Sequence, residues 1–433
     1  MRGPLQEMLS GRGLRLEDWK HLRSHHRPQG AVSALYRVRC RPRTGSVPST
    51  SSPRGSSSAA DATAPAAADA TAPAAADATA PATADATAEA PAAGAVAESL
   101  TLYVGVTTAG TPAAPGLVPA RIAGLALGMW LHPHDPVLAS LPWATDGEAV
   151  GRDVFGSAAA ARLSLLAYRP LRRAVVSAEH ADGSAYLKLL PKDMLPGLRY
   201  RHELLAGAGV PAPPLLSSPG GRDVAVLGAL PGTSLFRRIA EGGAPDIAPE
   251  SLLQLLDSLP AQALELPHRK AWADRAGDYA AAAAAVLPAE AHRIHGLAAG
   301  IAHVLASAPA GPQVPAHGDF HEGNLLVTGA EITGLLDIDG LGPGQRADDL
   351  ACLLGHLAVL AAAHPHQPHF ARALQRYRGV FQEAVDSAAL NARTAGVVLT
   401  LVAGARPVKQ SSSSHQARLR LEVAEGLLRE AGG

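Results

Sequence analysis

Residues 317–324 read HGDFHEGN, and an aliphatic run, LLV, follows at residues 325–327. A second stretch, ITGLLDIDG, occupies residues 332–340. Both stretches combine short apolar runs, which are typical of strands, with glycines and polar residues, which are typical of turns. The turn over residues 317–324 separates two strand-like runs, so its polar side chains can converge on a cleft.

Three polar residues of these stretches suit phosphoryl transfer, a reaction that needs strict positioning and neutralisation of charge. A carboxylate must orient the acceptor hydroxyl and take its proton, and Asp319 suits that role. A second carboxylate and an amide oxygen must hold the magnesium ions that bridge the nucleotide phosphates, and Asp337 and Asn324 suit this role. The two stretches therefore predict a site that uses ATP and Mg²⁺.

The combination of HGDFHEGNLL with LLDIDG resembles the aminoglycoside phosphotransferase and choline-kinase-like group, whose fold is that of protein kinases. The spacing H-x-D-x-x-x-x-N is a weak signal alone, and the glycines, the aliphatic run and the second Asp motif strengthen it. The resemblance extends over about residues 160–405. It implies that Asp319 is the catalytic base, Asn324 a metal ligand and Asp337 the principal metal-binding carboxylate.

Upstream of these motifs, the pattern predicts a small β-rich lobe. Strand-like runs occupy residues 163–168, 174–178 and 185–190, with an Asp-Gly turn signal between the last two. A helix is predicted at residues 198–206, and another strand at residues 224–230.

The resemblance assigns nucleotide-binding roles within this lobe. It implies that Lys188, in the third strand, contacts the α- and β-phosphates and pairs with Glu203 of the next helix. It also implies that the backbone of Leu227 and Ala229 reaches the adenine. The turn at residues 168–173, YRPLRR, departs from the glycine-rich G-x-G-x-x-G loop of protein kinases. Whether backbone amides or an arginine covers the phosphates therefore stays open.

The rest of the chain after residue 229 is predicted to be mainly helical. The expected helices lie at residues 249–264, 272–307, 346–363, 368–387, 390–404 and 415–431. We therefore expect an α+β, two-lobed protein-kinase-like fold, with an N-lobe at residues 160–228 and a helical C-lobe at residues 229–433.

Residues 1–145 are predicted to form an N-terminal β-containing extension with an insert. Residues 32–39 and 100–106 alternate as half-buried strands do, whereas residues 44–97 are low in complexity and include near-copies of DATAPAAA. Because these repeats contain no large apolar residue, we expect a disordered tether whose deletion leaves folding intact. For LHPHDP, at residues 131–136, the prolines favour a structured turn over a metal site.

Composition limits the classes of partner. Lys plus Arg and Asp plus Glu are 38 each, which gives no support for binding to nucleic acid or to an anionic membrane. Two cysteines exclude a disulfide framework and fit a reducing cytoplasm. The N-terminus has no signal-like apolar run, and no apolar stretch reaches the length of a membrane span. We expect a cytoplasmic protein whose partners are a nucleotide and a small-molecule acceptor.

Four further residues of the motif region have structural alternatives. We expect His317 to orient the backbone of the turn, and His321 to lie near the phosphate without a chemical role. For Asp339, assistance to the metal and capping of the next turn are both open. The resemblance suggests that Asp349, at the start of a helix, anchors the catalytic turn.

Two other functions are compatible with the sequence. One is a catalytically inert kinase-like module that binds a nucleotide or a partner, and the other is a maltose-phosphorylating enzyme with an N-terminal cap. We expect the acceptor to contact the region of residues 272–279 and the helices after Asp349. The slight acidic excess after residue 229 would suit a polycationic aminoglycoside but does not decide between acceptors.

Overall fold

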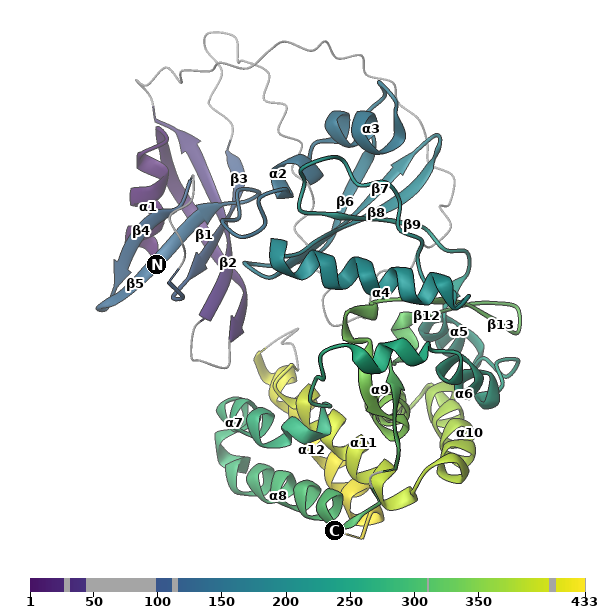
Figure 1. Ribbon diagram of the computed structural model, residues 1–433. Helices are drawn as coiled ribbons and strands as arrows, with labels where there is room; N and C mark the ends of the chain where they lie inside the picture. The colour runs from purple at the N-terminus through teal and green to yellow at the C-terminus, as the bar shows by residue number, and fades with distance from the viewer. Residues whose placement is uncertain (27–31, 44–98, 111–115, 310, 405–409, 433) are drawn as a thin grey trace. The chain divides into compact units, whose positions relative to one another are not determined.

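The computed structural model describes residues 1–26, 32–43, 99–110, 116–309, 311–404 and 410–432 of the 433-residue chain. These residues form two compact units (Figure 1). The first contains the described residues of 1–195 together with 216–227, and the second contains those of 196–215 and 228–432. The predicted tether at residues 44–97 lies outside the described residues. The division into an extension at residues 1–145, an N-lobe at residues 160–228 and a C-lobe at residues 229–433 stays a prediction.

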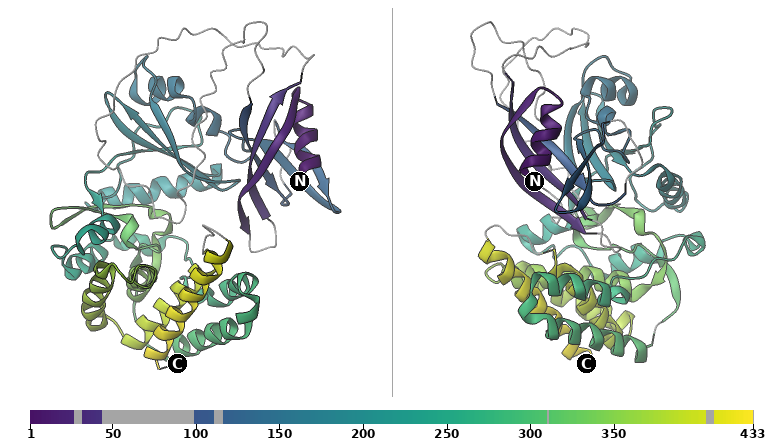
Figure 2. Two further views of the ribbon diagram at one scale, coloured as in Figure 1. Left: turned by 180° about the vertical axis from the view of Figure 1, so that it is seen from behind. Right: turned by 90° about the vertical axis from the view of Figure 1, so that its left-hand side faces the viewer.

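The N-terminal part of the first unit is a five-stranded antiparallel sheet in the order β1-β2-β3-β5-β4. Its strands are β1 (Leu14–His26), β2 (Val32–Pro42), β3 (Leu100–Thr107), β4 (Val118–Ile122) and β5 (Leu125–Leu131). Strands β2 and β3 pair with each other, as their alternating sequences predict. Helix α1 (Arg2–Ser10) lies on one face of this sheet (Figure 2), where it buries Leu5, Met8 and Leu9 at helical spacing.

A second sheet of the first unit has the order β6-β7-β8-β9, in which β6 pairs with β7 and β7 with β8 in antiparallel fashion. Its strands are β6 (Arg162–Arg169), β7 (Arg173–His180), β8 (Gly183–Leu189) and β9 (Ala225–Gly228). The predicted Asp-Gly hairpin joins β7 to β8, where His180 pairs with Gly183. Two short helices, α2 (Leu141–Ala144) and α3 (Gly147–Phe155), share the apolar core of this sheet.

Asp135, from the turn that follows β5, connects the two sheets of the first unit. Its buried carboxylate accepts hydrogen bonds from the Tyr168 hydroxyl, at 2.8 Å, and from the Leu171 backbone N–H, at 2.8 Å. The Trp130 indole N–H of β5 donates in turn to the Tyr168 hydroxyl over 3.1 Å. The segment at residues 131–136 is thus a structured turn, as expected, and its aspartate holds the N-terminal sheet to the second sheet.

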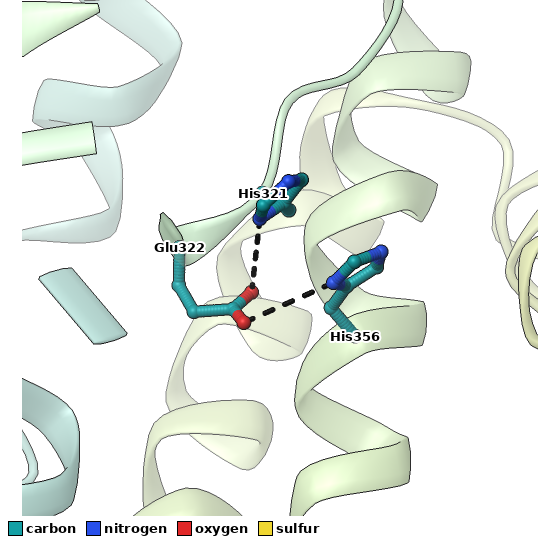
Figure 3. A group of neighbouring side chains, drawn as sticks. All are labelled: His321, Glu322 and His356. Atoms are coloured by element: carbon teal, nitrogen blue, oxygen red, sulfur yellow. Dashed lines mark ion pairs between the residues drawn. The ribbon is translucent and has the colours of Figure 1, made fainter. Parts of the chain in front are cut away.

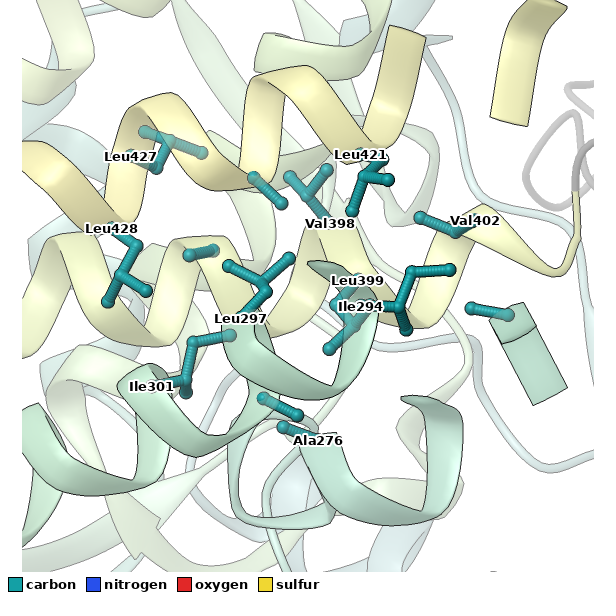
Figure 4. Packing of buried hydrophobic residues seen from close by; sticks show 14 of the residues in the cluster. Ala276, Ile294, Leu297, Ile301, Val398, Leu399, Val402, Leu421, Leu427 and Leu428 are labelled. Atoms are coloured by element: carbon teal, nitrogen blue, oxygen red, sulfur yellow. The ribbon is translucent and has the colours of Figure 1, made fainter. Parts of the chain in front are cut away.

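The second unit is mainly helical. Its helices are α4 (Leu195–Gly207), α5 (Leu235–Gly242), α6 (Pro249–Asp257), α7 (Ala276–Val286), α8 (Ala291–Ser307), α9 (Arg346–Ala363), α10 (Pro368–Ala384), α11 (Ser387–Val402) and α12 (Gln410–Glu430). Figure 4 shows the core that α7, α8, α11 and α12 enclose, filled by aliphatic side chains such as Ile294, Leu399 and Leu421. None of the described helices is both long and apolar enough to cross a membrane.

Short strands of the second unit carry the two motif stretches. Strands β10 (Thr233–Ser234), β12 (Leu325–Thr328) and β13 (Glu331–Leu335) form one sheet, and β11 (Gln313–Ala316) and β14 (Gly342–Gln345) form another. The HGDFHEGN turn therefore leaves β11 and enters β12. The LLDIDG stretch lies between β13 and β14.

The fold class is α+β, as predicted, and most predicted elements are present. Two long predicted helices were wrong in extent. The helix expected at residues 249–264 ends at Asp257. Leu259 precedes Pro260, and the residue before a proline disfavours helical backbone, so the helix does not continue to residue 264. The helix expected at residues 272–307 is divided at Pro288 into α7 and α8 for the same reason. Helix α5 was not predicted.

Candidate active site

The HGDFHEGN turn is anchored by a carboxylate from α9. Asp349, 1% exposed, accepts hydrogen bonds from the backbone N–H groups of His317, at 2.7 Å, and Gly318, at 2.8 Å. Burial raises the pKa of the Asp349 carboxyl to about 6, although the two N–H groups and the Arg346 charge oppose the shift. These contacts give Asp349 the anchoring position that the sequence predicted.

His317 connects the two motif stretches. Its ring is buried; Nε2 lies 2.9 Å from the Leu336 carbonyl oxygen, and Nδ1 accepts from the Asp319 N–H at 3.3 Å. Burial lowers the pKa of His317, although the nearby carboxylates and the Leu336 carbonyl oppose the shift. A neutral ring with its proton on Nε2 satisfies both contacts. His317 thus orients backbone, as expected.

The three predicted catalytic and metal-binding residues lie on these connected turns. The Asn324 amide N–H₂ donates to the Asp319 carbonyl at 2.9 Å, and the Leu336 N–H donates to the Asn324 carbonyl at 2.8 Å. Asn324 is 1% exposed, and its Oδ1 has no hydrogen-bond partner among the described residues. Asp337 has left-handed backbone angles, with φ +52° and ψ +54°, which a residue other than glycine adopts at a cost.

Two glycines bring the stretches into backbone contact. Gly318 has φ +81°, and a Cβ there would lie 2.9 Å from the Gly340 carbonyl oxygen. A Cβ on Gly340 would lie 2.6 Å from the His317 carbonyl oxygen. A side chain at either position would therefore push the loop after Asp339 away from the turn that bears Asp319.

One face of α9 supports the whole turn. Asp349, Cys352 and His356 follow one another at helical spacing, so their side chains share a face. Cys352 donates a weak hydrogen bond to Asp319 Oδ1 over 3.9 Å. His356 Nδ1 lies 3.8 Å from Glu322 Oε1. The helix thus contacts the first three residues of the turn and Glu322.

His321, Glu322 and His356 form a close group in which the first two residues are buried and His356 is partly exposed (Figure 3). Burial raises the pKa of Glu322, but its pairing with His356 outweighs this effect and leaves the pKa below its usual value. Burial also lowers the pKa of His356, and the pairing with Glu322 again outweighs it and raises that pKa. Both directions indicate an ion pair between Glu322 and His356.

Three potential metal ligands also meet in this group, but their orientation opposes a shared ion. The imidazole rings of His321 and His356 stack with centroids 4.3 Å apart and an interplanar angle of 11°. Because ligand lone pairs lie in the ring plane, nearly parallel rings cannot both direct a nitrogen at one ion between them. His321 Nδ1 already accepts from the Gly323 N–H at 3.0 Å. The group is an ion pair with a neutral imidazole stacked on it.

A pocket opens beside the HGDFHEGN turn. Its walls include Gly318, Gly340, Trp272, Arg269, Lys270 and Arg275, all from the second unit. The Trp272 indole N–H donates to the Gly318 carbonyl at 3.1 Å, so the aromatic wall is fixed to the residue before Asp319. This wall includes part of the region expected to contact the acceptor.

Residues 176–390 match the family model described as the phosphotransferase enzyme family. This part of the chain belongs to that family. The match contains β8, the HGDFHEGN turn, the LLDIDG stretch and α9. No protein of curated function matches the sequence.

Solved structures similar to the chain include members of the same broad group. The apo form of a thermostable mutant of aminoglycoside phosphotransferase APH(4)-Ia has 14% identity and a TM-score of 0.48, over 66% of this chain and 99% of that one. Plasmodium vivax ethanolamine kinase has 13% identity and a TM-score of 0.46, over 66% and 89%. A choline/ethanolamine kinase family protein from Mesorhizobium loti has 21% identity and a TM-score of 0.41, over 63% and 91%. At these scores the similarities add nothing to the family assignment.

The predicted nucleotide-binding residues of this phosphotransferase divide between the two units. Lys188 is buried in β8 and Leu227 in β9, both in the first unit. Glu203, on α4, and Ala229 belong to the second unit, and both are exposed. The pairing of Lys188 with Glu203 and the contact of Leu227 and Ala229 with adenine therefore stay predictions.

Sequence reasoning missed the basic wall of the pocket and the contribution of His356. The basic wall could have been predicted from the run His268-Arg269-Lys270 ahead of Trp272, which concentrates cations beside the expected acceptor region. The contribution of His356 could have been predicted from the helical spacing of Asp349, Cys352 and His356, which places them on one helix face. The partners of that face in the turn were not readable from the sequence.

Proposed function

We propose that this phosphotransferase moves the γ-phosphate of ATP to a hydroxyl of a small molecule. In the proposed reaction Asp319 orients the acceptor hydroxyl and takes its proton, while the hydroxyl oxygen bonds to the γ-phosphorus and ADP leaves. The anchoring of its turn by Asp349, and the contact of Cys352 with Asp319, support this role because they fix where the carboxylate lies.

Asn324 and Asp337 are proposed to hold Mg²⁺. A buried amide oxygen without a partner costs free energy in a folded protein, and Asn324 Oδ1 is such an atom. Carboxylate and amide oxygens are the ligands that Mg²⁺ prefers, so the donor set fits this ion. When bound, Mg²⁺ would neutralise charge on the nucleotide phosphates. The unpartnered Asn324 oxygen, next to Asp319 in the turn, is the observation that carries the proposal.

Four further residues, two from each unit, are proposed to complete the nucleotide site. Lys188 would contact the α- and β-phosphates with Glu203 as its partner, and the backbone of Leu227 and Ala229 would bind adenine. A lysine that is 6% exposed in a strand suits this role, since buried lysines are rare without a functional or ionic partner. Both cysteines are free thiols, which suits a reducing compartment such as the cytoplasm.

The test is release of ADP from ATP by the purified full-length chain, with Mg²⁺ and a panel of alcohols, sugars, amino alcohols and aminoglycosides. We expect acceptor-dependent ADP release that a chelator abolishes. The variant Asp337→Ala should need far more Mg²⁺ for half-maximal rate, whereas the matched control Asp246→Asn, at a surface ion pair with Arg238, should behave as wild type. Absence of phosphate transfer to every acceptor, with ATP left intact, would overturn the proposed activity.

A further inference from the structure

The wall of the pocket beside the HGDFHEGN turn includes two cations without an ion-pair partner among the described residues. Arg269 and Lys270 are exposed at its wall, and neither forms an ion pair or hydrogen bond with another described residue. A third cation, Arg275, lies 5.0 Å from the centre of the Tyr279 ring and 3.8 Å from the exposed carboxylate of Asp278. The pocket therefore presents at least two cationic side chains to whatever enters it.

The acidic residue of the wall does not cancel this charge. Asp348 is the one carboxylate among the residues that line the pocket, and it is bound by the Arg393 guanidinium and by the Gln345 backbone N–H at 3.0 Å. Arg393 is buried, so the Asp348 charge is already matched inside the protein. Arg201 adds a further cation: burial lowers its pKa, the Asp339 charge opposes this shift, and the nearby Arg269 charge adds to it.

The position of the pocket relates it to the acceptor. Trp272 connects its wall to the Gly318 carbonyl, one residue before Asp319, and Gly340 lines it from the loop after Asp339. Its cavity volume is about 40 Å³, roughly three times what one water needs, so a small polar group fits it.

Isolated surface cations are common and most of them bind only water. Here two unpaired cations lie at a concave wall that also includes glycine backbone, an indole and the Asp348 carboxylate already bound by Arg393, and field lines are concentrated at such a wall. A polycationic acceptor would be repelled from such a wall, whereas an oxyanion would gain charge-assisted hydrogen bonds from the arginine and the lysine.

We infer that the acceptor of this phosphotransferase carries an oxyanion, a carboxylate or a phosphate, that binds Arg269 and Lys270 while the acceptor hydroxyl meets Asp319. The inference rests on the proposed function. It disfavours a polycationic acceptor, which the slight acidic excess of the C-terminal part would suit without deciding for it. The charge at the pocket and the charge of the whole unit have opposite signs, and the pocket is where the acceptor binds.

The first experiment compares acceptors that share a hydroxyl framework and differ by the anion: glycerol with glycerate, sorbitol with gluconate, and glucose with glucose 6-phosphate. Ethanolamine and hygromycin B represent cationic acceptors. We expect an anionic member to be phosphorylated with at least tenfold higher kcat/KM than its neutral partner. Comparison of the two carboxylates with the phosphate ester shows which of the two oxyanions the pocket prefers. Preference for a neutral or cationic acceptor would overturn the inference and leave the proposed phosphotransfer standing.

The second experiment removes the cations with the double variant Arg269→Gln, Lys270→Gln. Both side chains are exposed, so the fold should persist. We expect KM for the anionic acceptor to rise at least about tenfold, with KM for ATP unchanged, because each charge-assisted contact is worth on the order of tenfold or more in binding. Arg418→Gln is the matched control, since it removes one exposed cation from α12, away from the pocket.

A binding measurement decides the inference even if no acceptor is phosphorylated. In calorimetric titration with inorganic phosphate, the wild type and Arg418→Gln should bind with similar affinity, and the double variant at least about tenfold more weakly. Equal affinity of the wild type and the double variant, or no binding by the wild type at millimolar phosphate, would overturn the oxyanion site.

Discussion

Substitution of Gly318 by alanine tests the contact between the two motif stretches. The added Cβ would lie 2.9 Å from the Gly340 carbonyl oxygen and 3.3 Å from two further backbone atoms of Gly340. Backbone atoms cannot rotate away as a flexible side chain can, so the loop after Asp339 must shift by a few tenths of an ångström. The residue also has φ +81°, which alanine adopts only under strain.

The two costs can be separated with Gly329→Ala as the matched control. Gly329, between β12 and β13, has φ +58° but no heavy atom within 4 Å of an added Cβ. Left-handed backbone should cost either variant about 1–2 kcal/mol. The clash at Gly318 should add about 1–3 kcal/mol, as overpacking does in cores. Gly318→Ala should therefore lose about 2–5 kcal/mol of unfolding free energy, and Gly329→Ala only the smaller part.

Urea unfolding of the two variants measures this difference, and phosphotransfer assays show its functional effect. Displacement of the turn should lower kcat at least about tenfold in Gly318→Ala, because small misplacements of a catalytic group are costly. Gly329→Ala should retain wild-type kcat. Equal loss of stability in both variants, together with unchanged kcat in Gly318→Ala, would refute the account of the close approach.

Three other variants test separate contacts. Asn324→Ala should raise the Mg²⁺ concentration for half-maximal rate about 10-fold or more; an unchanged Mg²⁺ titration would show that the amide is no ligand. His356→Gln leaves Glu322 as a buried unpaired charge, so unfolding free energy should fall by about 3–5 kcal/mol, and the double variant with Glu322→Gln should regain part of it. Asp135→Ala deprives Tyr168 of its acceptor, and a loss of less than about 1 kcal/mol in denaturant unfolding would contradict its bridging role.

The sequence predicted those parts of the fold that depend on local pattern. Strands β2 and β3 alternate along the chain and pair as expected, although more than 50 residues separate them. Helices α9, α10 and α11 have continuous apolar periodicity and lie close to their predicted bounds. Two helices that were predicted as continuous from their apolar periodicity are interrupted near Pro260 and Pro288. The reason is that the residue before a proline avoids helical backbone.

Within the site, the residue types were readable but their environment was not. The motif spacing singled out Asp319, Asn324 and Asp337 as candidates, since carboxylates and an amide are what phosphoryl transfer needs, and their roles stay a prediction. That Asn324 Oδ1 is buried without a partner depends on packing from α9 and the strands, which no local pattern encodes. The cations at the pocket were also not readable from composition, because acidic residues elsewhere in the C-terminal part outnumber Arg269 and Lys270.

The variant Asp319→Asn tests the central claim most directly. Turnover should be measured with the best acceptor of the panel, and nucleotide affinity by calorimetric titration of the same protein. Because the Asp319 carboxylate is proposed to act on the acceptor hydroxyl and not on the phosphates, kcat should fall by about 10²- to 10⁴-fold, with ATP affinity nearly unchanged. Near-wild-type turnover in this variant would contradict the assignment of Asp319 as the catalytic base.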